Sequence, residues 1–320
     1  MRLPRVLLAV IGLALAGLVL AWTFLGSPTI TKDTSFTIPA GASVASVADK
    51  LEAEGLISSA SGFVLQARVF GSDSPIQAGE FLLTPDMSQG DILAAFQSGD
   101  VIRRFVTIPE GMPSILVWER LMAEDLLTGD VAVPPEGSIL PDTYAFERGQ
   151  SRKSLVEQMQ AAMDKALAEE WGKRAPGIAV DTMRDALILA SIVEKETGKP
   201  EERRMVAGLY SNRVRTGMKL QADPTIIYPV TKGKPLGRRI KQSEISAVNG
   251  YNTYTRAGLP EGPITNPGRA SIAAVMNPEN TAALFMVADG TGGHWFADTL
   301  AQHNANVAKW YAIRRERGEM

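Results

Sequence analysis

The chain has 320 residues, of which 45% are hydrophobic and 21% charged, and its formal net charge is −2 at pH 7. This length and composition suit an anchored region followed by two modest folded domains, and they exclude a disordered or collagen-like chain. The small acidic surplus argues against a nucleic-acid binder. Cysteine is absent and histidine occurs only at His294 and His303, so we expect no disulfides, no metal centre and no cofactor.

The N-terminal segment predicts a membrane anchor. Arg2 and Arg5 precede residues 6–25, a stretch without charge in which Thr23 is the only polar side chain. About twenty helical residues cross the hydrocarbon core, and flanking positive charges stay in the cytoplasm. We therefore expect residues 1–5 to form a cytoplasmic tip, residues 6–25 a single transmembrane span, and the rest to cross the membrane. A cleaved signal peptide is the alternative, because residues 14–16 have the small-residue pattern of a cleavage site.

The next region repeats a short pattern of strand, proline-containing turn and helix. Residues 26–36 read as a linker, and the pattern then recurs near residues 38–51, 84–96 and 108–121. Such small units must pack on one another. We expect a small α/β subdomain over residues 37–100, and connecting strands and a loop over residues 101–150.

From residue 151 the sequence becomes mostly helical, and we expect one domain over residues 151–320. Four helices are predicted, over residues 154–167, 181–197, 200–215 and 300–311. Two strands, 283–288 and 294–297, flank a glycine turn. The long segment 221–268 is rich in proline and lacks periodicity, which often marks a functional region. The fold class predicted for the whole chain is α+β.

Glu194 is the first candidate for chemistry. It follows residues 186–193, eight residues without a charge, in a helix that Asp181 would cap. Such a helix should be buried, and burying a carboxylate disfavours its charged form, which suits a general acid. Glu196 faces another side of the helix, since positions i and i+2 diverge. A solvated last turn is the alternative interpretation for Glu194.

Glycoside cleavage is a natural reaction for such an acid, and most glycosidases pair it with a second carboxylate. Asp223 is the best candidate for that partner, because Pro224 should hold it in an extended conformation. Asp223 could equally be a turn residue that bonds its own backbone. The polar and aromatic loop 251–254 could stack on sugar rings and bond their hydroxyls, or could be a packed loop. His294 could bind a ligand or be a satisfied strand histidine.

Together these motifs resemble the endolytic murein transglycosylases, also called the YceG-like family. The similarity is densest over residues 180–304, and Ala222 stands where the family often has Thr. The matching blocks are EG at 136–137, PDTY at 141–144, LASIVEKET at 189–197, NR at 212–213, LQADPT at 220–225, YNTY at 251–254, GLP at 258–260, PI at 263–264, NPG at 266–268, ADG at 288–290 and GH at 293–294.

The resemblance implies a membrane-anchored lytic transglycosylase with a LysM-like subdomain and a periplasmic catalytic domain. Glu194 would be its single acid/base, cleaving the bond between N-acetylmuramic acid and N-acetylglucosamine to leave a 1,6-anhydromuramyl end. Its partners would be peptidoglycan strands and the inner membrane, with peptidoglycan synthases as further candidate partners. The expected cleft residues are Gln221, Asp223, Thr225, Tyr228, Asn252, Tyr254 and Asn266.

Two other functions remain open on the sequence. One is a two-carboxylate peptidoglycan hydrolase in which Glu194 and Asp223 act together. The other is a non-catalytic protein that binds the cell wall through its LysM-like part.

Overall fold

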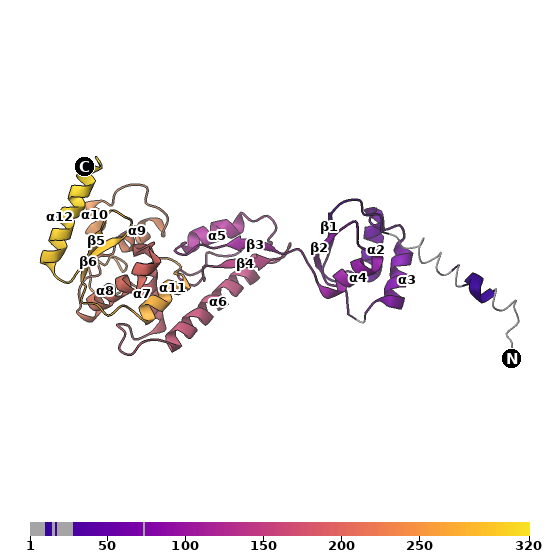
Figure 1. Ribbon diagram of the computed structural model, residues 1–320, viewed down its shortest axis with the longest axis horizontal. Helices are drawn as coiled ribbons and strands as arrows, with labels where there is room; N and C mark the ends of the chain where they lie inside the picture. Colours follow the sequence, from indigo (N-terminus) through magenta and orange to yellow (C-terminus); the bar gives the residue numbers. More distant parts are fainter. Residues whose placement is uncertain (1–9, 15–16, 18–27, 73) are drawn as a thin grey trace. The chain divides into compact units, whose positions relative to one another are not determined.

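The structure, a computed structural model, describes residues 10–14, 17, 28–72 and 74–320. The chain divides into two compact units, whose elements are labelled in Figure 1. The first unit holds the described residues up to Arg104 together with Phe146–Arg148, and the second holds Phe105–Ala145 and Gly149–Met320. Each unit has its own buried core.

The first unit combines an antiparallel strand pair with helices (Figure 1). Its elements are β1 (Thr34–Ile38), α2 (Val44–Ala53), α3 (Ala60–Phe70), β2 (Gly79–Leu83) and α4 (Gln89–Ser98). Phe36 of β1 lies opposite Phe81 of β2, and both rings pack on Phe96 of α4. Serine side chains cap the three helices, which is why each begins where it does.

A buried acid also stabilises this unit. Glu80 of β2 is only 3% exposed, and its Oε2 lies 2.6 Å from Arg104 Nη1 and 2.9 Å from Arg148 Nε. Burial alone would raise the pKa of Glu80, but hydrogen bonds from the two arginines lower it overall.

The second unit is mainly helical with two small strand pairs, β3–β4 and the antiparallel β5–β6. Its elements are β3 (Arg104–Thr107), α5 (Ser114–Met122), β4 (Thr143–Phe146), α6 (Arg152–Gly172), α7 (Met183–Glu196), the 3-10 helix η1 (Pro200–Glu202), α8 (Arg203–Arg215), α9 (Pro224–Thr231), α10 (Gln242–Ile245), α11 (Arg269–Met276), β5 (Phe285–Ala288), β6 (His294–Ala297) and α12 (Leu300–Glu316). The predicted α+β class is confirmed.

Helix α7 lies at the centre of this unit. It packs against α8, α9 and α11, and α11 also contacts α6 (Figure 1). Leu189, Ala190 and Val193 are fully buried, as the uncharged run predicted. Because α7 is packed on several neighbours, it cannot rotate, and the directions of Glu194 and Glu196 in its last turn are fixed.

Three local predictions are wrong in detail. The cap of α7 is Thr182, whose hydroxyl accepts from the Asp185 N–H, so Asp181 lies outside the helix. The segment 221–268 contains α9 and α10 and is not irregular throughout. Asp223 is helical (φ −53°, ψ −39°) and not extended, because Pro224 occupies the first position of α9, where its fixed φ suits a helix.

The predicted span 6–25 lies mostly outside the described residues, which include only 10–14 and 17 of it. Among the described residues, no helix has the length and apolar character needed to cross a membrane.

Candidate active site

Glu194 occupies a niche formed by two glycines. The backbone N–H of Gly268 donates to Glu194 Oε2 at 2.9 Å. On the other side, a Cβ added to Gly111 would lie 3.4 Å from Glu194 Cγ, and Gly111 has a left-handed φ of +71°. The residue is partly buried. The last turn of α7 therefore holds the carboxyl in one orientation against backbone, and does not leave it free in solvent.

A second carboxylate, Glu110, borders the same niche. A Cβ on Gly268 would lie 2.0 Å from Glu110 Oε1, so the Glu110 carboxyl packs directly against the Gly268 backbone. Arg203 at the start of α8 pairs with Glu110 Oε2 at 2.8 Å. Glu110 was not among the predicted site residues, although its turn, residues 108–111, was recognised as a repeat of the strand-turn-helix pattern. Two acids thus face the backbone of Gly268.

Asn266 joins the segments that form this niche, and it does so from a fully buried position. Its Nδ2 donates to the Met112 carbonyl at 2.9 Å and to Ser114 Oγ at 3.1 Å, and its Oδ1 accepts from the Ile139 N–H at 3.0 Å. Its own carbonyl accepts from the Gly111 N–H. Asn266 therefore fixes the positions of both glycine-bearing turns around Glu194.

The turn before α9 is strained and tightly held. Gln221 is exposed and has a left-handed φ of 51°, which is uncommon for a residue other than glycine. Its N–H donates to the Thr253 carbonyl, and the Ala222 N–H donates to Thr253 Oγ1. Thr225 is fully buried and its hydroxyl donates to the Ala222 carbonyl at 2.7 Å. Strain of this kind persists where the surroundings over-determine it, and it often marks a functional site.

The loop 251–254 fastens that turn through an acid and a tyrosine. Tyr254 donates its hydroxyl proton to Asp223 Oδ1 at 2.5 Å. Burial and the neighbouring Asp223 raise the pKa of Tyr254 above its usual range. Asn252 is fully buried, and its Nδ2 donates to three backbone carbonyls, of Glu244, Ile245 and Ala247. Asn252 thus holds the loop together, while Asp223 remains exposed.

Tyr228 belongs to a separate cluster with Glu136 and Tyr251. The two tyrosine rings lie 4.8 Å apart between centroids. Glu136 Oε1 accepts from the Ser114 N–H at 2.9 Å. Desolvation raises the pKa of Glu136, and desolvation with the Glu136 charge raises the pKa of Tyr228. The sequence analysis included Glu136 in a motif that matches the family, residues 136–137, but predicted no role for it.

A cavity of ≈ 480 Å³ opens beside the Glu194 niche. Its lining includes Gly111 and Lys195, which flank Glu194 in space and in sequence, and Pro224, which follows Asp223. The volume lies within the range of small-ligand sites. Glu110 also lines the cavity, whereas Glu194, Gln221 and Asp223 are not among the lining residues.

A large rise in the pKa of a carboxyl group falls on Glu196, which the sequence analysis excluded as a partner for Glu194. Burial is the main cause, and it raises the pKa of Glu196 to about 7, with a smaller contribution from the charge of Asp223. Part of the residue is exposed, but its Oε1 atom is buried. Its burial depends on packing between distant segments, so no local signal could have revealed it.

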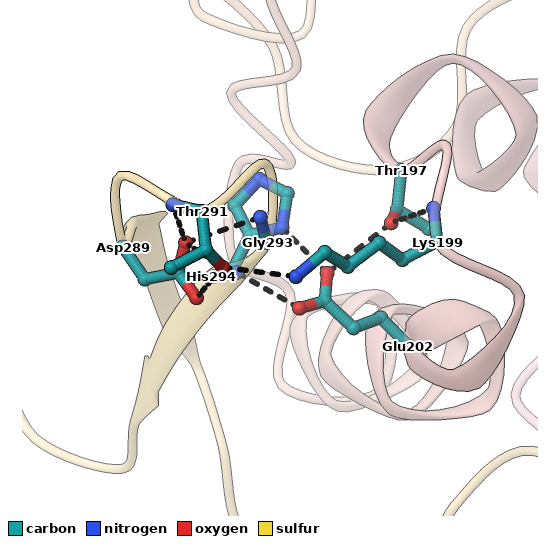
Figure 2. A network of polar contacts seen from close by, with 7 residues as sticks. All are labelled: Thr197, Lys199, Glu202, Asp289, Thr291, Gly293 and His294. Carbon is teal, nitrogen blue, oxygen red and sulfur yellow. Dashed lines mark hydrogen bonds and ion pairs between the residues drawn. The ribbon is translucent and has the colours of Figure 1, made fainter.

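The β5–β6 turn docks on the segment that follows α7 (Figure 2). Glu202 accepts from the His294 N–H at 2.9 Å and contacts His294 Nδ1 at 2.8 Å. Lys199 Nζ donates to Thr291 Oγ1 at 3.0 Å. His294 is thus a satisfied strand histidine paired with an acid, and the network anchors the chain just beyond Glu196.

The predicted site residues therefore fall into two groups. Gln221, Asp223 and Tyr254 lie at an exposed turn and its supporting loop, and Glu194 lies in the glycine niche beside the cavity. Thr225, Asn252 and Asn266 are fully buried and hold loops in place, and Tyr228 is nearly so.

With this geometry established, sequence comparison places the chain in a family. A sequence profile of the YceG-like family matches residues 36–309, and the chain belongs to that family. The endolytic murein transglycosylase of Streptococcus pneumoniae strain D39 is 29% identical over 322 residues, covering 85% of this chain. The protein of the same name from Bacillus subtilis strain 168 is 26% identical over 329 residues, covering 90% of this chain and 89% of its own length.

The chain spans 57% of the length of the pneumococcal relative. A crystal structure described as a yceG-like protein from Listeria monocytogenes is also similar, with a TM-score of 0.53 and 26% sequence identity. That match covers 86% of this chain and 98% of the Listeria chain.

Proposed function

We propose that this protein is a peptidoglycan lytic transglycosylase in which Glu194 is the acid/base. The observation that carries the proposal is the glycine niche, where Gly268 orients a partly buried carboxyl beside a ligand-sized cavity. Membership of the YceG-like family and the names of the pneumococcal and Bacillus relatives support the substrate class.

The reaction needs only one residue to transfer both protons. Protonated Glu194 donates to the glycosidic oxygen between N-acetylmuramic acid and N-acetylglucosamine, and the C1–O bond breaks as the N-acetylglucosamine hydroxyl leaves. The C6 hydroxyl of the muramyl residue attacks C1, and its proton returns to Glu194. The products are a 1,6-anhydromuramyl end and a free N-acetylglucosamine end, and no water is consumed. General acid–base catalysis of this kind contributes about 10²–10⁴-fold to the rate.

The surroundings of Glu194 suit both transfers. Only Oε2 accepts a hydrogen bond from the described part of the protein, which leaves Oε1 for substrate. Glu110 borders the niche as part of an ion pair with Arg203, so the Glu194 carboxyl has a polar neighbour on the side of Gly268.

The anchor and the accessory unit complete the proposal. The uncharged stretch 6–25 would tether the enzyme to the inner membrane with its catalytic unit in the periplasm, near nascent glycan strands and their synthases. The first unit, with a core of its own, would serve as the LysM-like module.

Product analysis on uncrosslinked glycan strands tests the activity. Mass spectrometry should detect anhydromuramyl ends, which lack the water that hydrolysis adds. Hydrated ends that disappear in Asp223→Asn would instead identify the two-carboxylate hydrolase. If the strands stay intact after incubation with folded protein, the protein is not an enzyme for this substrate, and the hypothesis of a non-catalytic wall-binding scaffold remains.

A further inference from the structure

Glu196 brings a buried carboxyl to a cluster that the proposed reaction does not use. Its Oε1 has no hydrogen-bond partner among the described residues. Tyr210 of α8, which is 2% exposed, hydrogen-bonds the carboxyl group. Glu194 and Glu196 stand two positions apart on α7, so they face different surroundings: the glycine niche for one and this cluster for the other.

The cluster contains one positive group for two acids. The titratable and charged groups that face Glu196 in the described structure are Tyr210 and Arg213 from α8, Asp223 from the turn before α9, and Tyr254 from the following loop. Arg213 is the one cation that faces Glu196 among the described residues, and its guanidinium also hydrogen-bonds backbone carbonyls. Ionising Glu196 would add a second charge in a buried place without a second cation, which is costly.

Arg213 connects the cluster to the strained turn. It is 8% exposed, and its guanidinium donates to the carbonyls of Leu220 at 2.5 Å and Leu284 at 2.7 Å. Leu220 precedes Gln221, whose left-handed backbone needs external support. Asp223, two residues later, is held by Tyr254. The electrostatic balance of the cluster thus acts on the exposed turn that carries Gln221 and Asp223.

We propose that Glu196 is a positioning residue whose neutral carboxyl keeps the Gln221–Asp223 turn and Tyr254 in their working arrangement. When Glu196 loses its proton, its charge repels Asp223 and attracts Arg213, so the turn shifts and activity falls. The inference rests on the proposed transglycosylase function and assigns to Glu196 a part in the alkaline loss of activity, in addition to the deprotonation of Glu194 that the mechanism itself requires.

The test is the pH–rate profile of the full-length protein and of Glu196→Gln, measured as anhydromuramyl ends released from uncrosslinked glycan. The wild-type rate should fall by about tenfold per pH unit well above the titration midpoint. The midpoint of the alkaline fall should move in Glu196→Gln, because glutamine stays neutral and only the loss of the proton from the general acid Glu194 then lowers the rate. Glu201→Gln, which removes an exposed acid of η1, is the matched control and should keep the wild-type profile.

The possible outcomes separate the two proposals. An active wild type whose alkaline fall persists with the same midpoint in Glu196→Gln overturns the role of Glu196 alone. A wild type that makes no anhydromuramyl ends at any pH refutes the proposed function, and the role of Glu196 in that reaction with it.

Thermal unfolding at mildly acidic and mildly alkaline pH gives a second readout. The melting temperature should depend less on pH in Glu196→Gln than in the wild type. An equal dependence would show that Glu196 holds no buried proton.

Discussion

Replacing Asn266 by alanine should weaken the second unit more than any exposed substitution. The side chain is fully buried and makes three hydrogen bonds, to the Met112 carbonyl, Ser114 Oγ and the Ile139 N–H. Ser114 keeps another partner in the Pro135 carbonyl, so the buried Ile139 N–H and the partly buried Met112 carbonyl are left unsatisfied. At about 1–3 kcal/mol for each, with a small cavity added, the expected loss is about 3–5 kcal/mol.

Urea unfolding followed by tryptophan fluorescence measures this loss. Beyond Trp22, every tryptophan lies in the second unit, so the signal reports on the unit that contains Asn266. The midpoint should fall while the slope stays constant. Asn280→Ala, at an exposed asparagine, is the matched control and should change stability by less than about 0.5 kcal/mol. A loss below about 1 kcal/mol in Asn266→Ala would show that Asn266 does not hold the two glycine turns together.

Three further predictions concern buried polar groups. The pKa of Glu196 is raised from 4.5 to about 7, so its contribution to stability is complete below pH 4.5 and lost as pH rises through about 7. The free energy of unfolding should therefore fall by at most about 3 kcal/mol over this pH range. The Glu196→Gln variant should lack this fall when unfolding is measured at several pH values. The same dependence on pH in the variant and the wild type would contradict this prediction. Glu80→Gln should lower the stability of the first unit by about 1–3 kcal/mol, because Arg104 and Arg148 lose their charged partner, and calorimetry that shows no change would count against the ion pairs. Thr253→Val should cost about 1–3 kcal/mol by removing a buried hydroxyl that bonds the turn before α9, and an unaltered urea midpoint would exclude that role.

The sequence predicted those parts of the fold that local pattern determines. The uncharged run before Glu194 predicted a buried helix, and α7 has that position and burial. Its N-cap was misplaced by one residue because Asp181 and Thr182 are both good capping residues, and only the backbone direction selects Thr182. Helix α9 was missed because it is short and contains Pro229, which normally argues against a helix.

The candidate site could be predicted only in part, since motifs identify residues but not their surroundings. Asn252 and Asn266 stood out as members of unusual polar blocks, yet both are buried and bond to backbone. Glu110 was overlooked and Glu196 was excluded as a partner for Glu194, because their environments come from residues far away in the sequence, Gly268 for the first and Tyr210 for the second. Desolvation by such long-range packing has no signature in a local stretch of sequence.

The most direct test of the central claim is the product yield of Glu194→Gln on uncrosslinked glycan strands. Glutamine keeps the shape of the side chain and an oxygen that can accept from the Gly268 N–H, but it cannot transfer the proton. We expect anhydromuramyl ends to fall by at least about 10²-fold while the urea midpoint stays close to that of the wild type. Retention of full activity in a folded Glu194→Gln protein would contradict the assignment of Glu194 as the acid/base.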